Sequence, residues 1–299
     1  MGLSIFFKRS FIKSIALFMI VLAFFTWSVV WGLAQNTAPG GIITGKVMAV
    51  FFVDVGQADC IFIHTPNNLN MLIDAGNRED YPQINRFLQA QNVTRLDVVV
   101  ATHPHEDHIG SMEEIIRNFQ IGKLYMPKVS TATRTFEGLL QAIRIKGLKV
   151  NVAKAGVKID LGPGFTSEFI APNNDDYDDL NNYSGVIKVS YHKVALLLTG
   201  DAERISEQEM LDKGYDLKAD VLKVGHHGSN SSSSAAFLKQ VAPSIAIISV
   251  GVDNPYHHPG LSTLKRLARS GARIYRTDRD GTIRLLTDGD KIEIRNYRY

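Results

Sequence analysis

Four side chains of the kind that bind metal ions lie within residues 103–108 (His-Pro-His-Glu-Asp-His), directly after an apolar run. His103 and His105 are two positions apart and can point the same way from an extended segment, and Asp107 and His108 follow at once. Imidazole and carboxylate groups together suit Zn²⁺, with Mn²⁺ or Fe as competitors. The segment therefore predicts that two neighbouring divalent metal ions are held largely by one loop.

The N-terminus indicates membrane targeting, because basic residues within the first 13 positions precede residues 14–34, which carry no charge. About 20 apolar residues can cross a bilayer as a helix, and this is longer than the apolar part of most cleaved signal peptides. We expect residues 1–34 to be an uncleaved signal anchor; a cleaved signal peptide is the alternative, because residues 32–34 (Gly-Leu-Ala) form a cleavage motif. Since the basic residues come first, either interpretation places the remaining chain outside the cytoplasm.

Composition indicates one folded domain after this segment. Of the 299 residues, 45% are hydrophobic and 21% charged, which is typical of a globular protein. Residues 35–45 have the composition of a linker, so we place the domain at 46–299. The single cysteine, Cys60, excludes an internal disulfide and a Cys-x-x-Cys metal site. The net charge of +3 indicates no partner, but residues 261–299 carry ten Lys and Arg against five Asp and Glu, which predicts a basic face or an ordinary solvated surface.

Ligand-type side chains recur where predicted strands end. Asp74, Asp201 and His226 each follow an apolar β-branched run, and Asp74 is placed to brace a neighbouring loop by accepting backbone N–H groups. Strands and helices alternate in the middle of the chain, which is typical of an α/β fold whose strand ends gather a site. Predicted strands are 43–53, 60–65, 70–73, 96–101, 123–126, 148–152, 165–171, 186–191, 194–198, 219–224, 244–250, 273–275, 282–286 and 291–295; predicted helices are 82–91, a helix capped by Ser111 and Glu114, 134–146, 203–213 and 262–270.

Together these motifs resemble the metallo-β-lactamase superfamily, and more narrowly the extracytoplasmic hydrolase domain of the ComEC-type DNA-uptake proteins. The resemblance runs from about residue 46 to the C-terminus. It implies an α/β fold, an αββα sandwich with the metal ions at one edge, here preceded by the one N-terminal hydrophobic helix. The matching segments are His103 to His108, Asp54-Val-Gly-Gln-Ala-Asp59, Leu72-Ile-Asp-Ala-Gly76, Leu198-Thr-Gly-Asp-Ala202, Leu222-Lys-Val-Gly-His-His-Gly-Ser229, Asn254-Pro-Tyr-His-His-Pro259 and Thr277-Asp-Arg-Asp-Gly281.

The resemblance also implies roles for individual residues. His103 and His105 would bind one ion, Asp107 and His108 the other, and Asp201 would bridge the two. Either His226 or His227 would complete the second site, and we expect His226 because it comes first after the strand.

One departure from the family pattern weakens the first site. The superfamily's third histidine is absent, and residues 181–184 (Asn-Asn-Tyr-Ser) stand in its place. The first metal ion is therefore expected to be weakly held.

The predicted activity is metal-dependent hydrolysis, because two divalent ions about 3.5–4 Å apart can generate a bridging hydroxide and clamp a phosphoryl group. We expect a phosphodiesterase or nuclease that acts on DNA, with catalytic roles for Asp107, His227 and His258. His227 or His258 would protonate the leaving oxygen, and serines and backbone N–H groups of residues 228–232 would meet the developing charge.

Several alternatives remain open from the sequence. The substrate could instead be a lactone, a thioester, a β-lactam or a phosphocholine ester, or the domain could be a catalytically impaired module that binds metal or nucleic acid. If DNA is the substrate, a separate DNA-uptake channel is an expected partner, because one predicted membrane span cannot translocate DNA.

Overall fold

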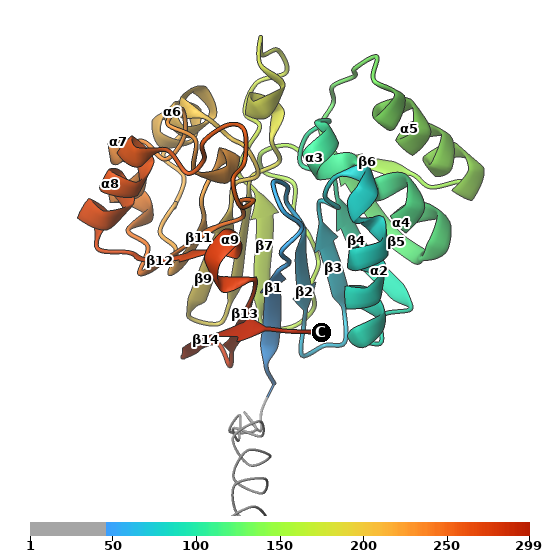
Figure 1. The fold of residues 1–299 in the computed structure, drawn as a ribbon, viewed down its shortest axis with the longest axis horizontal. Coiled ribbons are helices and arrows are strands. Elements are labelled where there is room, and N and C mark those ends of the chain that lie inside the picture. The colour runs from blue at the N-terminus through green and yellow to red at the C-terminus, as the bar shows by residue number, and fades with distance from the viewer. Residues whose placement is uncertain (1–45) are drawn as a thin grey trace, which may run out of the picture. The chain divides into compact units, whose positions relative to one another are not determined.

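The computed structural model describes residues 46–299, which form two β-sheets lying face to face (Figure 1). The first sheet has the strand order β14-β13-β1-β2-β3-β4-β5-β6, and the second has the order β12-β11-β10-β9-β8-β7. The strands are β1 (Met48–Phe52), β2 (Ile61–His64), β3 (Asn70–Ile73), β4 (Arg95–Val100), β5 (Gln120–Met126), β6 (Val150–Val152), β7 (Phe165–Phe169), β8 (Ile187–Tyr191), β9 (Val194–Leu198), β10 (Val221–Lys223), β11 (Ile245–Ile248), β12 (Arg273–Arg276), β13 (Thr282–Thr287) and β14 (Ile292–Tyr297).

Helices cover the outer face of each sheet. In Figure 1 the helices α2, α4 and α5 lie on one side of the molecule, and α6, α7 and α8 lie on the other. The helices are α2 (Tyr81–Ala90), α3 (Glu106–Ile109), α4 (Met112–Asn118), α5 (Arg134–Lys146), α6 (Arg204–Asp212), α7 (Ala235–Val241), α8 (Leu261–Ser270) and α9 (Thr277–Asp280), with short 3₁₀ turns η1 (Arg78–Asp80), η2 (Leu180–Tyr183) and η3 (His226–Gly228).

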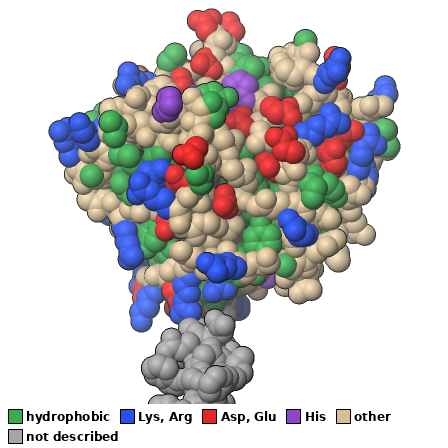
Figure 2. All heavy atoms as spheres, in the orientation of Figure 1, with side chains coloured by type: hydrophobic (Ala, Val, Ile, Leu, Met, Phe, Trp, Pro, Cys, Tyr) green, Lys and Arg blue, Asp and Glu red, His purple; other side chains and the backbone are tan. Residues whose placement is uncertain are grey.

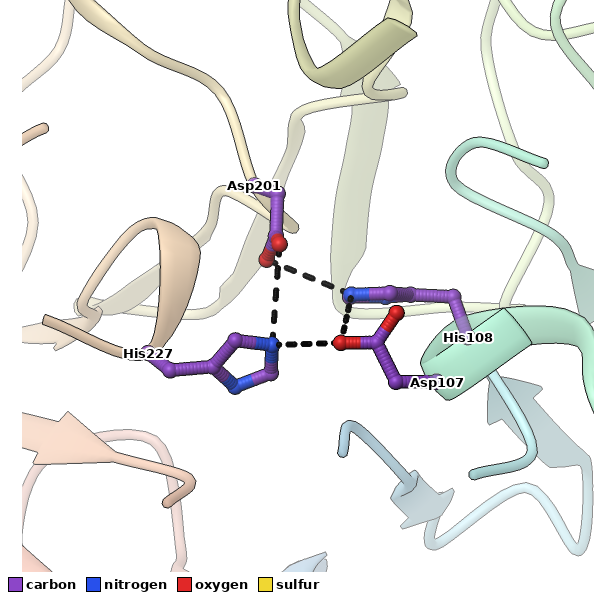
Figure 3. Close-up of side chains that lie close together, drawn as sticks. All are labelled: Asp107, His108, Asp201 and His227. Carbon is purple, nitrogen blue, oxygen red and sulfur yellow. Dashed lines mark hydrogen bonds and ion pairs between the residues drawn. The ribbon is translucent and has the colours of Figure 1, made fainter. Parts of the chain in front are cut away.

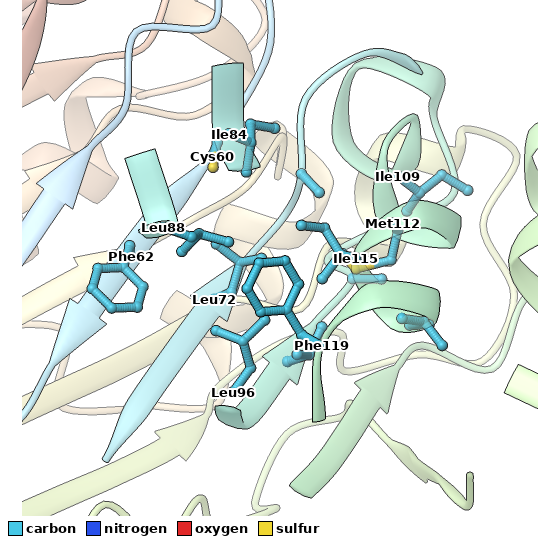
Figure 4. Packing of buried hydrophobic residues seen from close by; sticks show 14 of the residues in the cluster. Cys60, Phe62, Leu72, Ile84, Leu88, Leu96, Ile109, Met112, Ile115 and Phe119 are labelled. Carbon is cyan, nitrogen blue, oxygen red and sulfur yellow. The ribbon is translucent and has the colours of Figure 1, made fainter. Parts of the chain in front are cut away.

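Three layers of buried hydrophobic side chains join these elements, one between the sheets and one under each set of helices. Side chains alternate between the two faces of a strand, so in β3 Leu72 packs under the helices while Met71 and Ile73 pack against the second sheet. Figure 4 shows part of the helix-covered layer, where Leu72 and Leu96 of the sheet lie beside Ile115 of α4. The expected four-layer sandwich of two sheets between helices is confirmed.

Parallel strands bring the predicted site residues to one edge of the molecule. Strands β3 to β6 run parallel in the first sheet, and β9 to β12 run parallel in the second. Because parallel strands end at the same edge, the loops after β3, β4, β9, β10 and β11 are neighbours at the upper end of the view in Figure 1. The backbone N–H of Gly185 donates to the carbonyl of Thr102 at 2.9 Å and ties the two sheets together there.

Most predicted elements are present, and the differences have local causes. Strands β3 and β9 and helix α5 have the predicted bounds, whereas β1 begins at Met48 rather than at residue 43. Helix α4 begins directly after Ser111 as predicted, but the predicted capping bond is absent, because the Ser111 hydroxyl donates to the carbonyl of Asn77 at 2.5 Å. Helices α3, α7 and α9 were not expected, since each has only four to seven residues and shows no clear period in the sequence.

The predicted N-terminal hydrophobic helix at 14–34 lies outside the described residues and stays a prediction, as do the signal anchor at 1–34 and the linker at 35–45. Within residues 46–299, no helix has both the length and the apolar character needed to cross a bilayer.

The predicted basic face near the C-terminus does not stand out in the surface view. Figure 2 shows lysine and arginine side chains dispersed over this side of the molecule, with acidic side chains among them. This view therefore favours the alternative of an ordinary solvated surface.

Candidate metal centre

Asp107, His108, Asp201 and His227 converge at the edge where the strands end (Figure 3). Asp107 and His108 lie on α3 after β4, Asp201 follows β9, and His227 follows β10. One potential ligand atom from each residue lies within 4.8 Å of the others. The closest approaches are 3.1 Å between His227 Nε2 and Asp107 Oδ2 and 3.3 Å between His108 Nε2 and Asp201 Oδ1. The two sheets thus contribute two residues each to one cluster.

Hydrogen bonds fix which nitrogen of each imidazole faces the cluster. His227 Nδ1 lies 2.9 Å from the carbonyl oxygen of Ser249, and a carbonyl can only accept, so Nδ1 carries the proton. His108 Nδ1 lies 2.7 Å from Asp74 Oδ2, which likewise accepts from it. Both histidines therefore present Nε2 to the carboxylates, in the way that metal-binding histidines are oriented by an acceptor behind the ring.

This arrangement fits a divalent cation. His108 Nε2 and Asp201 Oδ1 are buried and face each other at 3.3 Å, but within residues 46–299 neither makes a hydrogen bond of normal geometry, although buried polar atoms are normally paired. Burial opposes charging of His108, but the carboxylates of Asp201 and Asp74 raise its pKa well above the usual value. The same set of two nitrogens and two carboxylates suits a cation such as Zn²⁺, which would satisfy both unpaired atoms.

Asp74 holds the ligand segment from behind. Its carboxylate accepts from the backbone N–H of Thr102 at 2.8 Å and from the Thr102 hydroxyl at 2.7 Å, in addition to His108 Nδ1. The expectation that Asp74 braces a neighbouring loop through a backbone N–H is confirmed. Because Asp74 is fully buried, these bonds compensate for removing its carboxylate from water.

His103 and His105 lie beside the cluster, but the structure does not place them in the four-residue group. His103 Nε2 is 2.9 Å from His105 Nδ1, so the two rings are hydrogen-bonded to each other. The hydroxyl of Ser184, one of the residues that replace the absent third histidine, lies 3.4 Å from His103 Nδ1 and accepts from the backbone N–H of Asp201 at 3.0 Å. The role of His103 and His105 as ligands of a first metal ion stays a prediction.

His226 occupies a different position from the one we expected. Its Nε2 lies 3.8 Å from Asp201 Oδ2, and its Nδ1 lies 2.8 Å from Glu203 Oε1. His227, by contrast, is buried and belongs to the four-residue group. The geometry therefore favours His227 over His226 as the ligand. The two residues are adjacent in the sequence, and both adopt positive φ angles, of 47° and 51°, in the turn η3, so strand periodicity could not tell which one points inward.

Comparison with known proteins identifies the family. The profile described as "Metallo-beta-lactamase superfamily" matches residues 53–252. The chain belongs to this superfamily. Its fold and its His/Asp cluster are those of a metal-dependent hydrolase of the superfamily, and the predicted resemblance is confirmed.

Relatives of this metallo-β-lactamase superfamily member include competence proteins. It is 32% identical over 280 residues to ComE operon protein 3 of Bacillus subtilis, covering 84% of this chain and 36% of that protein. It is 32% identical to Competence protein ComA of Neisseria gonorrhoeae over 79% of this chain and 32% of the relative. Recombination protein 2 of Haemophilus influenzae is 30% identical over 82% of this chain and 30% of its own length. The chain thus spans about a third of the length of these relatives.

Solved structures agree on the fold. The metallo-beta-lactamase fold protein YhfI from Bacillus subtilis superposes with a TM-score of 0.53 at 11% identity, covering 77% of this chain and 96% of that one. The CmlA beta-hydroxylase E377D mutant gives 0.52 at 16% identity, covering 77% of this chain and 52% of that one. At such low identity the likeness concerns the superfamily fold alone.

The cluster opens into a cavity of about 330 Å³. Burial and the neighbouring charges of His226 and His227 lower the pKa of His258 to about 4, so its ring is neutral near pH 7. A neutral ring does not favour the predicted role of His258 as the acid for a leaving oxygen. The residues that line the cavity are Gln57, His105, Glu106, Asp107, Asp201, His226, His227, Tyr256 and His258.

The serine run after His227 is a structural loop. The backbone N–H of Gly228 donates to the carbonyl of Gly225, and that of Ser229 donates to the carbonyl of His226. The N–H of Ser231 donates to Ser229 Oγ at 3.3 Å, and that of Ser232 donates to the carbonyl of Ser229 at 3.4 Å. The expectation that Gly228, Ser229 and their neighbours offer free donors to a substrate is therefore wrong for most of this loop.

A buried ion pair lies behind His227. Lys223 Nζ is 2.7 Å from Asp59 Oδ2, and both side chains are at most 1% exposed. Asp59 Oδ1 is 3.6 Å from His227 Nδ1, and the backbone N–H of Asp59 donates to the carbonyl of Asp107 at 3.0 Å. Asp59, the last residue of the resembling segment Asp54 to Asp59, supports the cluster from behind and does not line the cavity.

Replacing His227 by alanine is expected to weaken metal binding more than 100-fold, because removing a ligand should cost at least as much as removing a partner behind one, which costs about 10–100-fold. Replacing His226 by alanine should leave the bound metal in place. Metal content after dialysis and the dissociation constant from competition with a chromophoric chelator distinguish the two variants. Retention of tight binding by His227→Ala and its loss in His226→Ala would contradict the geometric assignment.

Proposed function

We propose that this chain is a metal-dependent phosphodiesterase that hydrolyses DNA outside the cytoplasm. The observation that carries the proposal is the cluster of Asp107, His108, Asp201 and His227, of which all but the buried His108 line an open cavity. Two of the relatives are named for competence and for recombination, which supports DNA as the substrate. The uncharged segment at 14–34 supports the location, and a separate DNA-uptake channel is the partner that fits it.

The chain's own residues have distinct parts in this reaction. A divalent ion, when bound, supplies a Lewis acid that polarises a phosphoryl oxygen and activates water. Asp107 and Asp201 offer carboxylate ligands. In the metal-free site the charged forms of His108 and His227 outweigh the burial of Asp201 and hold its pKa well below the usual value, and a bound ion would take the place of the Nε2 protons of these histidines. Asp74 and the carbonyl of Ser249 keep the two imidazoles in the tautomer that can bind the ion.

His226 is the residue best placed to protonate the leaving oxygen. It lines the cavity with its side chain 25% exposed, and Glu203 Oε1 orients the ring through Nδ1 at 2.8 Å. The hydroxyl of Ser231 donates to the same Glu203 oxygen at 2.5 Å and holds that carboxylate in place. A histidine whose outer nitrogen faces the substrate and whose inner nitrogen is bonded to a carboxylate is a common arrangement for proton transfer.

The acid role predicts an effect that depends on the leaving group. His226→Ala should lower kcat for DNA about 100-fold or more, because a sugar oxygen must be protonated as it leaves. The loss on bis(p-nitrophenyl) phosphate should be slight, since p-nitrophenolate leaves without a proton. Glu203→Gln should act in the same direction with a smaller effect. His257→Ala is the matched control, because this histidine is exposed and does not line the cavity. Equal losses on both substrates would rule out the acid role.

The function itself is tested with the purified chain, Zn²⁺ or Mn²⁺, and three substrates: bis(p-nitrophenyl) phosphate, single-stranded DNA and double-stranded DNA. Metal-dependent cleavage of DNA is the expected result. Stoichiometric metal binding without cleavage of any phosphodiester would overturn the proposal. Lactones, thioesters, β-lactams and phosphocholine esters would then be the next substrates to assay.

A further inference from the structure

A rigid loop presents an aromatic side chain at the mouth of the cavity. Tyr256 is 65% exposed, yet it belongs to the segment from Gly251 to Gly260, which is held by its own hydrogen bonds. The Asn254 amide donates to the carbonyls of Gly251 and His258 at 3.0 and 2.7 Å and accepts from the backbone N–H of His258 at 2.9 Å. The backbone that carries Tyr256 is therefore fixed by hydrogen bonds within the loop.

The same loop is anchored to the rest of the site at both ends. The backbone N–H of Gly251 donates to Gln57 Oε1 at 3.1 Å, and Gln57 lines the cavity. The backbone N–H of Gly260 donates at 2.9 Å to the carbonyl of Gly228, the residue after His227. The position of Tyr256 is thereby fixed with respect to the metal cluster.

Aromatic rings form a row from the cluster to the surface. The ring of His226 lies 5.6 Å from that of His258 in an edge-on arrangement. The ring of His258 lies 5.8 Å from that of Tyr256, and these two planes are inclined by only 24°. All three rings line the cavity that holds Asp107 and Asp201. By comparison, exposed Tyr299 packs against Phe87, with the ring centroids 5.1 Å apart.

We propose that Tyr256, backed by His258, is a stacking subsite for the base of the nucleotide next to the scissile phosphodiester. This inference rests on the proposed function, because it is the phosphodiester at the metal cluster that brings a base to the row of rings. A nucleobase is planar and stacks on an aromatic ring without regard to its identity, since every base has a π-face. The subsite accordingly confers a preference for strands that carry bases and no preference for one sequence.

The test compares two single-stranded oligonucleotides of equal length, one of thymidines and one made entirely of abasic residues. Wild-type chain should cleave the thymidine strand with a kcat/KM about tenfold higher or more. Tyr256→Ala should lose this difference by slowing only on the thymidine strand, whereas Tyr256→Phe and Tyr256→Trp should keep it. Equal slowing of Tyr256→Ala on both strands, or full retention of the difference, would overturn the subsite.

Equilibrium binding separates this inference from the proposed function. The fluorescence anisotropy of both labelled strands is measured with Zn²⁺ present on strands with phosphorothioate linkages, which resist hydrolysis while the ion stays in place. If wild-type chain cleaves neither strand but binds the thymidine strand more tightly, and Tyr256→Ala abolishes that preference, the subsite stands while the proposed reaction fails. If neither cleavage nor binding distinguishes the strands, the subsite is overturned.

Discussion

Replacing Asp201 by alanine is expected to lower metal-dependent hydrolysis at least about 1000-fold, since a Lewis acid contributes several kcal/mol and each 1.36 kcal/mol is tenfold in rate. Asp201 faces both imidazoles of the cluster, with Oδ1 at 3.3 Å from His108 Nε2 and Oδ2 at 3.5 Å from His227 Nε2. Its loss removes a charged ligand that no neighbour replaces. The measurement is kcat/KM on bis(p-nitrophenyl) phosphate, together with metal content after dialysis.

A matched control keeps this result interpretable. Asp290→Ala removes an aspartate from an exposed ion pair with Lys193 and should leave activity unchanged, because exposed ion pairs contribute little. Far-ultraviolet circular dichroism should show that Asp201→Ala remains folded, since the change also removes a buried carboxylate. An Asp201→Ala chain that binds metal stoichiometrically and retains activity would show that this residue is no ligand.

The second large effect concerns stability. Lys223→Met should lower the free energy of unfolding by about 3–5 kcal/mol, because it leaves the buried Asp59 carboxylate without its partner. The Lys223 ammonium group also donates to the carbonyl of Val224 at 3.0 Å, and that bond is lost as well. Urea denaturation followed by circular dichroism measures the change.

A double variant distinguishes a lost ion pair from lost packing. With Asp59→Leu added to Lys223→Met, the stranded charge is removed, and much of the stability should return, as buried ion pairs replaced by apolar groups are often neutral. If the double variant loses as much unfolding free energy as Lys223→Met and Asp59→Leu lose together when made separately, the charges are not coupled. The double variant should also weaken metal binding, because it removes the Asp59 carboxylate, whose Oδ1 lies 3.6 Å from His227 Nδ1.

The sequence predicted the elements and the ligand-bearing edge because both depend on local patterns. Strands such as 70–73 and 194–198 have continuous apolar runs, and Asp74 and Asp201 stand where those runs end. Sequence patterns could not predict contacts that depend on packing between the sheets. Asp59 and Lys223 lie 164 positions apart in the sequence, and no period or motif indicates that their charges meet in the core.

The assignment of the terminal histidine shows a second limit. Side chains alternate between the two faces of a strand, but strand β10 ends before His226. His226 and His227 both have left-handed backbone angles. In such a turn, strand alternation no longer tells which of the two side chains points inward. The inward residue is His227, and only the backbone conformation of η3 reveals it.

The division of the cluster between the two sheets has a consequence for the cohesion of the domain. Asp107 and His108 follow a strand of the first sheet, whereas Asp201 and His227 follow strands of the second. A cation bound by all four residues would link the two sheets at this edge, in addition to the backbone hydrogen bond from Gly185 to Thr102. Occupancy would then favour the closed sandwich by mass action, with about 2.7 kcal/mol at a free ion concentration 100 times the dissociation constant. The same ion would thus serve both the reaction and the cohesion of the two sheets.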